Sequence, residues 1–197
     1  VKICITGTAG FIGYHLAQKC IAEGHEVYGI DNINHYYDIN LKFGRLKELG
    51  IDQSIIFDSK LAQSNKYDNF KFYKDDIQTT KLISELKPDK VIHLASMAGV
   101  RYSIDNPLIY SNVNINGFIN ILEECVKNNI KSIIYASSSS VYGLNKKVPF
   151  NENDKIESCN SPYACSKISM ELYAQTYSQL YDISCIGLRF FTVYGPR

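Results

Sequence analysis

A tyrosine and a lysine four residues apart, Tyr163 and Lys167, are the side chains in this sequence best suited to proton chemistry. On a helix that spacing places both on one face, one turn apart. A phenol titrates near ~10 in water. Because a neighbouring ammonium stabilises the phenolate, we predict that Lys167 lowers the pKa of Tyr163 and makes it a base near neutral pH. The alternative is a Tyr–Lys pair on a solvated helix face.

Four consecutive serines, 137–140, follow a short apolar stretch that has the pattern of a strand. In open α/β sheets, ligands bind beyond the carboxyl ends of the strands. A serine hydroxyl there could share a proton with a substrate oxygen beside Tyr163. A flexible polar loop is the alternative interpretation.

Three glycines, Gly7, Gly10 and Gly13, separate the first apolar stretch from the first helical one, in TGTAGFIG. Such glycines allow a tight turn and close approach to a pyrophosphate, which the helix N-terminus binds. Asp31 ends the second predicted strand, about 18 residues past Gly13 and close to the ~20 expected for a ribose-binding carboxylate. That carboxylate accepts hydrogen bonds from a 2′-hydroxyl and repels a 2′-phosphate, and Asn32, not arginine, follows it. The pattern favours NAD over NADP.

Strand and helix patterns alternate along the chain, which predicts an α/β fold: a doubly wound parallel sheet with helices on both faces. The predicted strands are 1–6, 26–30, 70–73, 90–94, 132–136 and 183–190. The predicted helices are 11–23, 41–49, 79–86, 107–128 and 162–181. Segment 52–68 is polar with few structural signals, so we interpret 32–69 as an insertion.

Composition argues against several classes of protein. The net charge is +1 and there is no basic run, so nothing indicates nucleic-acid binding. No apolar run approaches the ~20 residues of a membrane span, and the N-terminal strand lacks a signal-peptide pattern. We expect His93 to be a core histidine.

The cysteines have no metal-like spacing, so we interpret them as small buried thiols of a reducing cytoplasm, with a disulfide or metal site as the alternative. They are Cys4, Cys20, Cys125, Cys159, Cys165 and Cys185.

Taken in this order, the motifs resemble the extended short-chain dehydrogenase/reductase family, the NAD-dependent nucleotide-sugar epimerases and dehydratases. The resemblance covers nearly the whole chain, through TGTAGFIG, DDI, HLASMAGV, SSSSVYG, YACSK and RFFTVYGP. Within the family, DNINHYYDINLKFGRL, AGVRYS, ASSSSVYGLN and LRFFTVYGP are most similar to the UDP-glucuronate 4-epimerases.

The resemblance implies a role for each site residue. Tyr163 is expected to be the base, Lys167 its electrostatic partner and Ser138 the hydroxyl that assists proton transfer. The implied reaction oxidises C4 of a UDP-sugar, rotates the 4-keto sugar and returns the hydride to the opposite face, while NAD stays bound. The residues expected to hold or line NAD are Gly7, Gly10, Phe11, Ile12, Gly13, Asp31, Asn32, Asp76, Ile77, Leu94, Ala95, Tyr163 and Lys167.

Ser139 and Ser140 favour epimerisation over dehydration. Related 4,6-dehydratases carry an Asp-Glu pair at these positions, and UDP-glucuronate decarboxylases carry Glu in place of Ser140. Elimination of water needs a base for the C5 proton and an acid for the leaving hydroxyl, and serine hydroxyls are poor at both.

The sugar is less constrained than the reaction. Arg101 could bind a uronate carboxylate or a diphosphate, a surface ion pair being the alternative. Thr192 stands where many hexose epimerases carry Asn, and its hydroxyl could bind a C6 carboxylate. With Ser138, Ser139 and Ser140 they form the expected substrate set. We favour UDP-glucuronate; the alternatives are a UDP-glucose or UDP-N-acetylhexosamine 4-epimerase, or a non-catalytic NAD-binding module.

Members of this family are longer than the present chain. We therefore interpret residues 1–197 as the NAD-binding Rossmann domain of a longer epimerase, with the C-terminal substrate-binding part largely absent. The resemblance also implies a homodimer in which helices 107–128 and 162–181 form a four-helix interface.

Overall fold

The computed structural model describes residues 1–154 and 158–197, in which seven strands form one sheet. The strands are β1 (Lys2–Thr6), β2 (Glu26–Asp31), β3 (Leu61–Gln63), β4 (Phe70–Lys74), β5 (Lys90–His93), β6 (Ser132–Ser138) and β7 (Ser184–Phe190). The α-helices are α1 (Phe11–Ala22), α2 (Ile39–Glu48), α3 (Leu82–Leu86), α4 (Val100–Asp105), α5 (Pro107–Tyr110), α6 (Gly117–Lys127) and α7 (Pro162–Tyr181). Short 3₁₀ or π turns occupy η1 (Gln53–Ile55), η2 (Ser111–Asn116) and η3 (Ser139–Tyr142).

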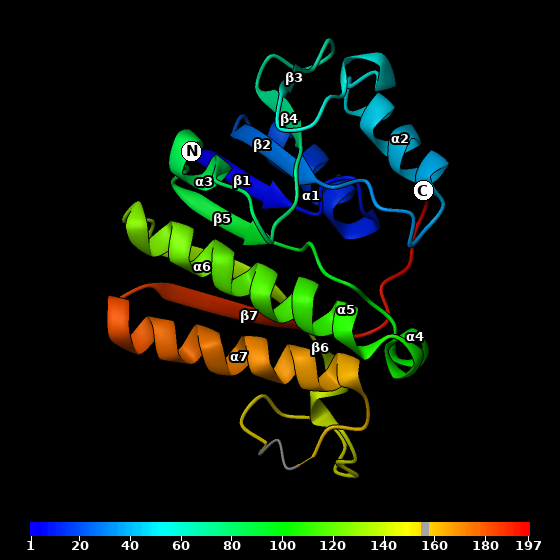
Figure 1. Cartoon of the computed structure of the whole chain (residues 1–197), viewed down its shortest axis with the longest axis vertical. Helices are drawn as coiled ribbons and strands as arrows, with labels where there is room; N and C mark the ends of the chain where they lie inside the picture. Colours follow the sequence, from blue (N-terminus) through cyan, green and yellow to red (C-terminus); the bar gives the residue numbers. More distant parts are fainter. Residues whose placement is uncertain (155–157) are drawn as a thin grey trace.

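The sheet has the strand order β3-β4-β2-β1-β5-β6-β7, of which the part from β3 to β5 can be followed in Figure 1. Every neighbouring pair is parallel except β3 and β4. Without the short edge strand β3, the six parallel strands follow the Rossmann order 3-2-1-4-5-6. The order reverses between β1 and β5, so the ligand crevice is expected beyond the carboxyl ends of these two strands.

Strand β1 shows how the sheet divides the core in two. Successive side chains of a strand point to opposite faces. Cys4 packs with residues of α3, α6 and α7 on one face, whereas Ile3 and Ile5 pack with residues of α1 and α2 on the other. Helices therefore cover both faces, as the alternating pattern predicts.

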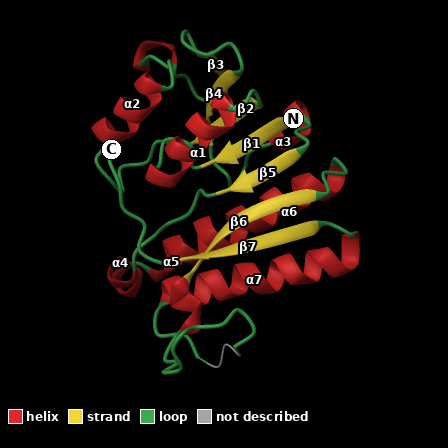
Figure 2. Cartoon of the chain, turned by 180° about the vertical axis from the view of Figure 1, so that it is seen from behind, coloured by secondary structure: helices red, strands yellow, loops and turns green. Residues whose placement is uncertain are grey.

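One part of the sheet is covered on a single face. Seen from behind, β6 and β7 lie in front of α6 and α7, and no helix of the described residues covers them on this side (Figure 2). Ile186 and Leu188 of β7 are 51% and 40% exposed there. Within the residues that the structure describes, no helix is long and apolar enough to cross a membrane.

Two predicted helices differ from the observed ones. The helix predicted for 79–86 begins only at Leu82, because side chains upstream form turn hydrogen bonds that compete with the helix: Thr80 Oγ1 accepts from the Leu82 amide and Asp76 Oδ1 accepts from the Gln78 amide. The helix predicted for 107–128 is interrupted by the π turn η2. The polar segment 52–68, for which the sequence offered few signals, contains η1 and β3.

The interpretation of all six cysteines as buried thiols is wrong for two of them. Cys159 and Cys165 are exposed and form a disulfide. They are six residues apart, a spacing that does not by itself predict pairing, and the two meet because the loop before α7 turns back onto the first turn of that helix. Cys4, Cys20 and Cys125 are buried free thiols, as predicted, and Cys185 is a half-buried free thiol.

Candidate functional site

The glycine loop between β1 and α1 has little room for side chains. Gly7 has φ +77°, and a Cβ on it would lie 2.7 Å from the Ala95 nitrogen. A Cβ on Gly13 would lie 2.1 Å from the Gly7 carbonyl oxygen. Gly10 caps α1 without a side-chain hydrogen bond, so the first amides of the helix are left to other partners. This bare helix N-terminus fits a dinucleotide pyrophosphate.

Asp31 ends β2 at the edge of the same crevice, and its side chain is only 7% exposed. Its Oδ2 accepts from the Ala9 amide at 3.1 Å and its Oδ1 from the Ile33 amide at 2.8 Å. The buried ammonium of Lys42, from α2, lies 3.5 Å from Oδ1. Sequence reasoning missed Lys42, because its burial depends on how α2 folds back over the end of β2.

Two adjoining pockets of about 110 and 330 Å³ form a continuous cleft beyond the carboxyl ends of the strands. Gly7, Gly10, Tyr37, Leu94 and Ser96 line both pockets. The predicted cofactor residues that line the cleft are Gly7, Gly10, Phe11, Ile12, Gly13, Asp31, Asn32, Ile77, Leu94, Ala95, Tyr163 and Lys167. Asp76 is absent from this lining, since its carboxylate accepts from the side-chain amide of Asn32 and the backbone amide of Gln78.

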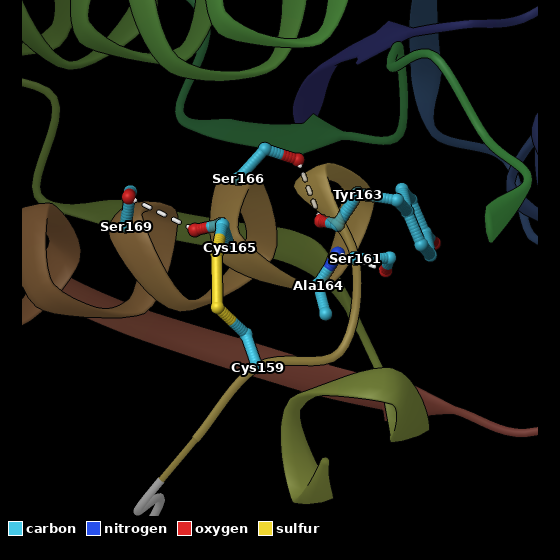
Figure 3. The surroundings of a disulfide bond; sticks show 7 residues. All are labelled: Cys159, Ser161, Tyr163, Ala164, Cys165, Ser166 and Ser169. Carbon is cyan, nitrogen blue, oxygen red and sulfur yellow. Dashed lines mark hydrogen bonds between the residues drawn. A yellow bond between two sulfur atoms is a disulfide. The ribbon is translucent and has the colours of Figure 1, made fainter. Parts of the chain in front are cut away.

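Helix α7 brings the Tyr163–Lys167 pair into the cleft. It begins with Ser161, whose hydroxyl accepts from the Ala164 amide at 3.1 Å (Figure 3), and Pro162 takes the first helical position. Both are favourable helix starts. One turn separates Tyr163 from Lys167, and both side chains line the larger pocket.

The electrostatics of this pair differ from the prediction. The Lys167 side chain is 1% exposed, and its Nζ donates to the Ala136 carbonyl at 2.9 Å and lies 5.9 Å from the centre of the Tyr163 ring. Burial lowers the pKa of Lys167 to about 7. The pKa of Tyr163 is raised, because desolvation outweighs the hydrogen bond with Ser138 that lowers it. The predicted lowering of the Tyr163 pKa by Lys167 is therefore wrong.

The four serines separate into distinct positions. Ser137 and Ser138 are the last residues of β6, and both line the pocket that holds Tyr163. The Ser138 Oγ also accepts from the Ser140 amide at 3.1 Å, which starts the turn η3. Ser139 and Ser140 belong to that turn and do not line either cleft pocket. The run is thus a strand end and an ordered turn, not a flexible loop.

The other two predicted substrate residues lie outside this cleft. Arg101 is exposed on α4, and Thr192 is exposed in the segment after β7. The neighbours of Thr192, Phe191 and Val193, do line the larger pocket.

His93 is fully buried, which confirms its place in the core, and its Nδ1 lies 2.9 Å from Thr6 Oγ1. Its Nε2 has no hydrogen-bond partner among the described residues, so the histidine is only partly satisfied. Burial lowers its pKa to about 3.

Asn114, which sequence reasoning missed, supports the site from outside the cleft. It is fully buried in the π turn η2, a distortion often found at functional sites. Its amide accepts from the Met97 nitrogen at 2.7 Å and donates to the Met97 carbonyl and to Ser166 Oγ, at 3.0 and 2.9 Å. Ser166 in turn donates to the Tyr163 carbonyl (Figure 3). Asn114 therefore links the loop after β5 to the first turns of α7.

A half-buried ion pair lies behind the end of β6. Arg189 of β7 donates twice to the Glu171 carboxylate, from Nε at 2.9 Å and from a terminal nitrogen at 2.8 Å. Ser137, next to Ser138, donates its hydroxyl proton to the same carboxylate. Glu171 lies one turn after Lys167 on α7, so one carboxylate connects β6, β7 and α7.

Comparisons with known proteins agree with this geometry. A profile of the NAD dependent epimerase/dehydratase family matches residues 3–197. Protein CapI of Staphylococcus aureus is 50% identical over 196 residues, which are 100% of this chain and 55% of CapI. UDP-glucuronate 4-epimerase 2 of Arabidopsis thaliana is 42% identical, over 100% of this chain and 43% of its own length. The chain thus spans about half the length of the curated relatives it matches.

Solved structures show the same relationship. The UDP-glucuronic acid 4-epimerase of Bacillus cereus, in complex with UDP-glucuronic acid and NAD, is 34% identical with a TM-score of 0.83, over 100% of this chain and 58% of that one. The UDP-N-acetylglucosamine 4-epimerase of Methanobrevibacter ruminantium, in complex with UDP-N-acetylmuramic acid, is 32% identical with a TM-score of 0.81, over 100% of this chain and 56% of that one. This chain belongs to the NAD-dependent epimerase/dehydratase family.

Proposed function

We propose that the chain carries the NAD-binding and proton-transfer centre of a nucleotide-sugar 4-epimerase, and that its sugar nucleotide is UDP-glucuronate. The observation that carries the proposal is the composition of the larger pocket. It is lined both by the glycine loop that fits a pyrophosphate and by Ser138, Tyr163 and Lys167. A dinucleotide and an acid–base pair can therefore meet at one place.

In this mechanism Tyr163 takes the proton from the C4 hydroxyl of the sugar while the C4 hydride leaves. Ser138, whose hydroxyl lines the same pocket as Tyr163, shares that proton. The same tyrosine gives the proton back after the 4-keto sugar has turned its other face. NAD, when bound, supplies the hydride acceptor and a positively charged nicotinamide ring.

Burial raises the pKa of Tyr163, so the phenol has to lose its proton before it can act as a base. A base is needed only when a sugar is oxidised, so positive charge brought next to the ring would lower the pKa at the required moment. Lys167 contributes to proton transfer through its position. Its hydrogen bond to the Ala136 carbonyl holds the amino group at the end of β6, which carries Ser138.

Serine at positions 139 and 140 supports epimerisation within this family. Both residues lie in η3, and neither lines the cleft. A carboxylic acid and a carboxylate, which elimination of water requires, are missing from these two positions. Hydride transfer with proton exchange at C4 needs neither.

UDP-glucuronate is favoured by two of the relatives described above, the plant enzyme at 42% identity and the Bacillus enzyme at 34%. The exposed Arg101 guanidinium has no ion-pair partner among the described residues, so it is available to an anionic group. Residues of the full-length protein beyond this chain would complete the sugar site.

The test is a substrate panel. The full-length protein is incubated separately with UDP-glucuronate, UDP-glucose and UDP-N-acetylglucosamine, and the products are separated by chromatography. We expect UDP-galacturonate to form with a kcat/KM at least about tenfold above that for either neutral sugar. Faster conversion of a neutral sugar would overturn the sugar assignment, and no conversion of any sugar would overturn the epimerase assignment.

A homodimer is part of the same proposal. Leu108 of α5 and Leu172 and Leu180 of α7 are 77%, 59% and 67% exposed. Large apolar side chains on neighbouring helices are suited to a helical interface between two copies. Light scattering of the full-length protein, with Leu172→Glu and Leu180→Glu as variants, tests it: we expect a dimer that the two substitutions dissociate.

A further inference from the structure

The disulfide encloses the proposed base. Cys159 lies in the loop before α7 and Cys165 in the first turn of that helix, and the closed ring contains Ser161 and Tyr163 (Figure 3). The bond therefore joins the two ends of the short segment that carries both the helix cap and the base.

The Cys159 end of the ring also touches the segment that follows Ser138. Gly143 ends the turn η3 with φ +56°, and a Cβ on it would lie 2.0 Å from the Ser158 carbonyl oxygen. The chain just before Cys159 is thus packed directly on this turn. Because Cys165 shares a helical turn with Tyr163, the disulfide links the supports of both hydroxyls, Ser138 and Tyr163.

Access separates this pair from the other cysteines. Both Cys159 and Cys165 are exposed, so a small thiol can reach their sulfurs. Cys4 and Cys125 are fully buried, and burial raises the pKa of the Cys4 thiol to about 12. Such thiols are inert, because the thiolate is the reactive form. Cys185 is half-buried, and burial raises the pKa of its thiol as well. Exchange with solution thiols is therefore expected mainly at Cys159 and Cys165.

We propose that Cys159 and Cys165 are a reversible thiol–disulfide modification site that controls how firmly Tyr163 is positioned. In the oxidising direction, one cysteine thiolate attacks a low-molecular-weight disulfide and releases one small thiol. The second cysteine then attacks the protein sulfur of the mixed disulfide, which forms the protein bond and releases the second small thiol. Two electrons and two protons pass from the cysteines to the small disulfide, and excess small thiol reverses both steps.

Reduction removes the covalent tie between the loop and α7. The segment 158–161 is then held by the Ser161 cap and by packing on Gly143, so it samples more positions. Since catalytic groups lose rate when they are displaced by fractions of an ångström, we expect kcat to fall about 3- to 10-fold on reduction. This rate effect rests on the proposed epimerase function; the chemical and exchange readouts below do not.

The experiment equilibrates the full-length protein in glutathione buffers from reducing to oxidising. Free thiols are alkylated and located by mass spectrometry, and amide hydrogen exchange is measured for residues 158–165. We expect Cys159 and Cys165 to become protected together in oxidising buffer, and the Tyr163–Cys165 amides to exchange faster after reduction. Labelling of both thiols in every buffer, or equal exchange in the two states, would overturn the proposal.

Two variants make the rate measurement specific. Cys159→Ser should have the kcat of the reduced enzyme in every buffer, whereas Cys185→Ser, which removes a half-buried free thiol, should keep the wild-type redox response. If kcat is equal in the reduced and oxidised wild-type enzyme, the claim that the disulfide controls the position of Tyr163 is wrong. A protein that converts no UDP-sugar overturns the proposed function, while labelling and hydrogen exchange still decide the redox site.

Discussion

Lys167 donates its side-chain hydrogen bond to the carbonyl oxygen of Ala136, at 2.9 Å, from a fully buried position. The lysine of the predicted catalytic pair is thus fixed to the end of β6, the strand that carries Ser138. Because Lys167 is buried at this position, its protonation should affect how the free energy of unfolding depends on pH.

Burial lowers the pKa of Lys167 to about 7, below its ordinary value of 10.5. Above pH 7 the unfolded chain therefore binds more protons at this lysine than the folded one does, and the stability of the ligand-free protein should rise with pH. The window closes at about pH 8.5, where thiols released on unfolding begin to ionise and oppose the trend. Lys167→Met should flatten this rise in urea-unfolding free energies measured from pH 7 to about 8.5.

Lys90→Met is the matched control, because Lys90 is an exposed lysine at the start of β5. It should leave the slope as in the wild type. An equal slope in wild type and Lys167→Met would show that Lys167 is charged in the folded protein at neutral pH.

The Glu171–Arg189 pair should act on rate through the position of Ser138. Glu171→Gln keeps the side-chain volume but removes the charge that accepts from Arg189 and Ser137. We expect kcat of the full-length enzyme to fall about tenfold with little change in the KM for UDP-sugar, since Glu171 contacts the strand that carries Ser138 and does not line the cleft. Leaving Arg189 unpaired should also cost about 2–4 kcal/mol of unfolding free energy.

Glu171→Asp offers a rescue test, because it restores the charge. Partial recovery of kcat is expected, while Glu123→Gln, on α6, should leave kcat unchanged. If Glu171→Gln lowered only the melting temperature and kept the wild-type kcat, the pair would be purely structural.

Gly13 should tolerate no side chain, because a Cβ there would lie 2.1 Å from the Gly7 carbonyl oxygen. Gly13→Ala should therefore distort the glycine loop, lowering both NAD affinity and the unfolding free energy, the latter by about 2 kcal/mol or more. Gly44, in α2, has open space around its Cβ position. Gly44→Ala should instead stabilise the protein by about 0.5–1 kcal/mol, without effect on NAD binding. Calorimetric NAD titration and urea unfolding of both variants test this prediction. Equal changes in NAD affinity and unfolding free energy for the two variants would contradict the close packing around Gly13.

Much of the fold and of the cofactor cleft could be predicted from the sequence, because the sequence patterns that indicate them lie within single elements. Helix α7 was predicted with its observed bounds, since Ser161 and Pro162 mark its start and a periodic pattern continues to Tyr181. The glycine spacing and Asp31 likewise predict the cofactor cleft. Each of these signals depends only on residues within one strand, turn or helix.

What could not be predicted depends on contacts between distant segments. β3 exists because Leu61–Gln63 pairs with β4, and its own residues have a weak strand pattern. Asn114 was hidden in a continuous helical pattern, and only its bonds to Met97 and Ser166 identify its role. The raised pKa of Tyr163 reflects desolvation by surrounding residues, which a motif of two residues does not contain.

Asp31 should contribute directly to dinucleotide affinity. Its carboxylate accepts two backbone amides and lies beside Lys42, so Asp31→Ala removes the ribose acceptor and leaves the Lys42 ammonium without its anion. We expect about tenfold weaker NAD binding, and less discrimination against NADP because the repulsion of a 2′-phosphate is lost. Titrations of both dinucleotides check this; unchanged NAD affinity would place the adenosine ribose elsewhere.

The most direct test of the central claim is the conversion of UDP-glucuronate by full-length Tyr163→Phe, with bound NAD measured on the same sample. Tyr173→Phe, on an exposed face of α7, is the matched control. If Tyr163 moves the C4 proton, turnover should fall by about 10²- to 10⁴-fold while NAD content stays at the wild-type level. Turnover of Tyr163→Phe within a few-fold of the control would contradict the assignment of Tyr163 as the base.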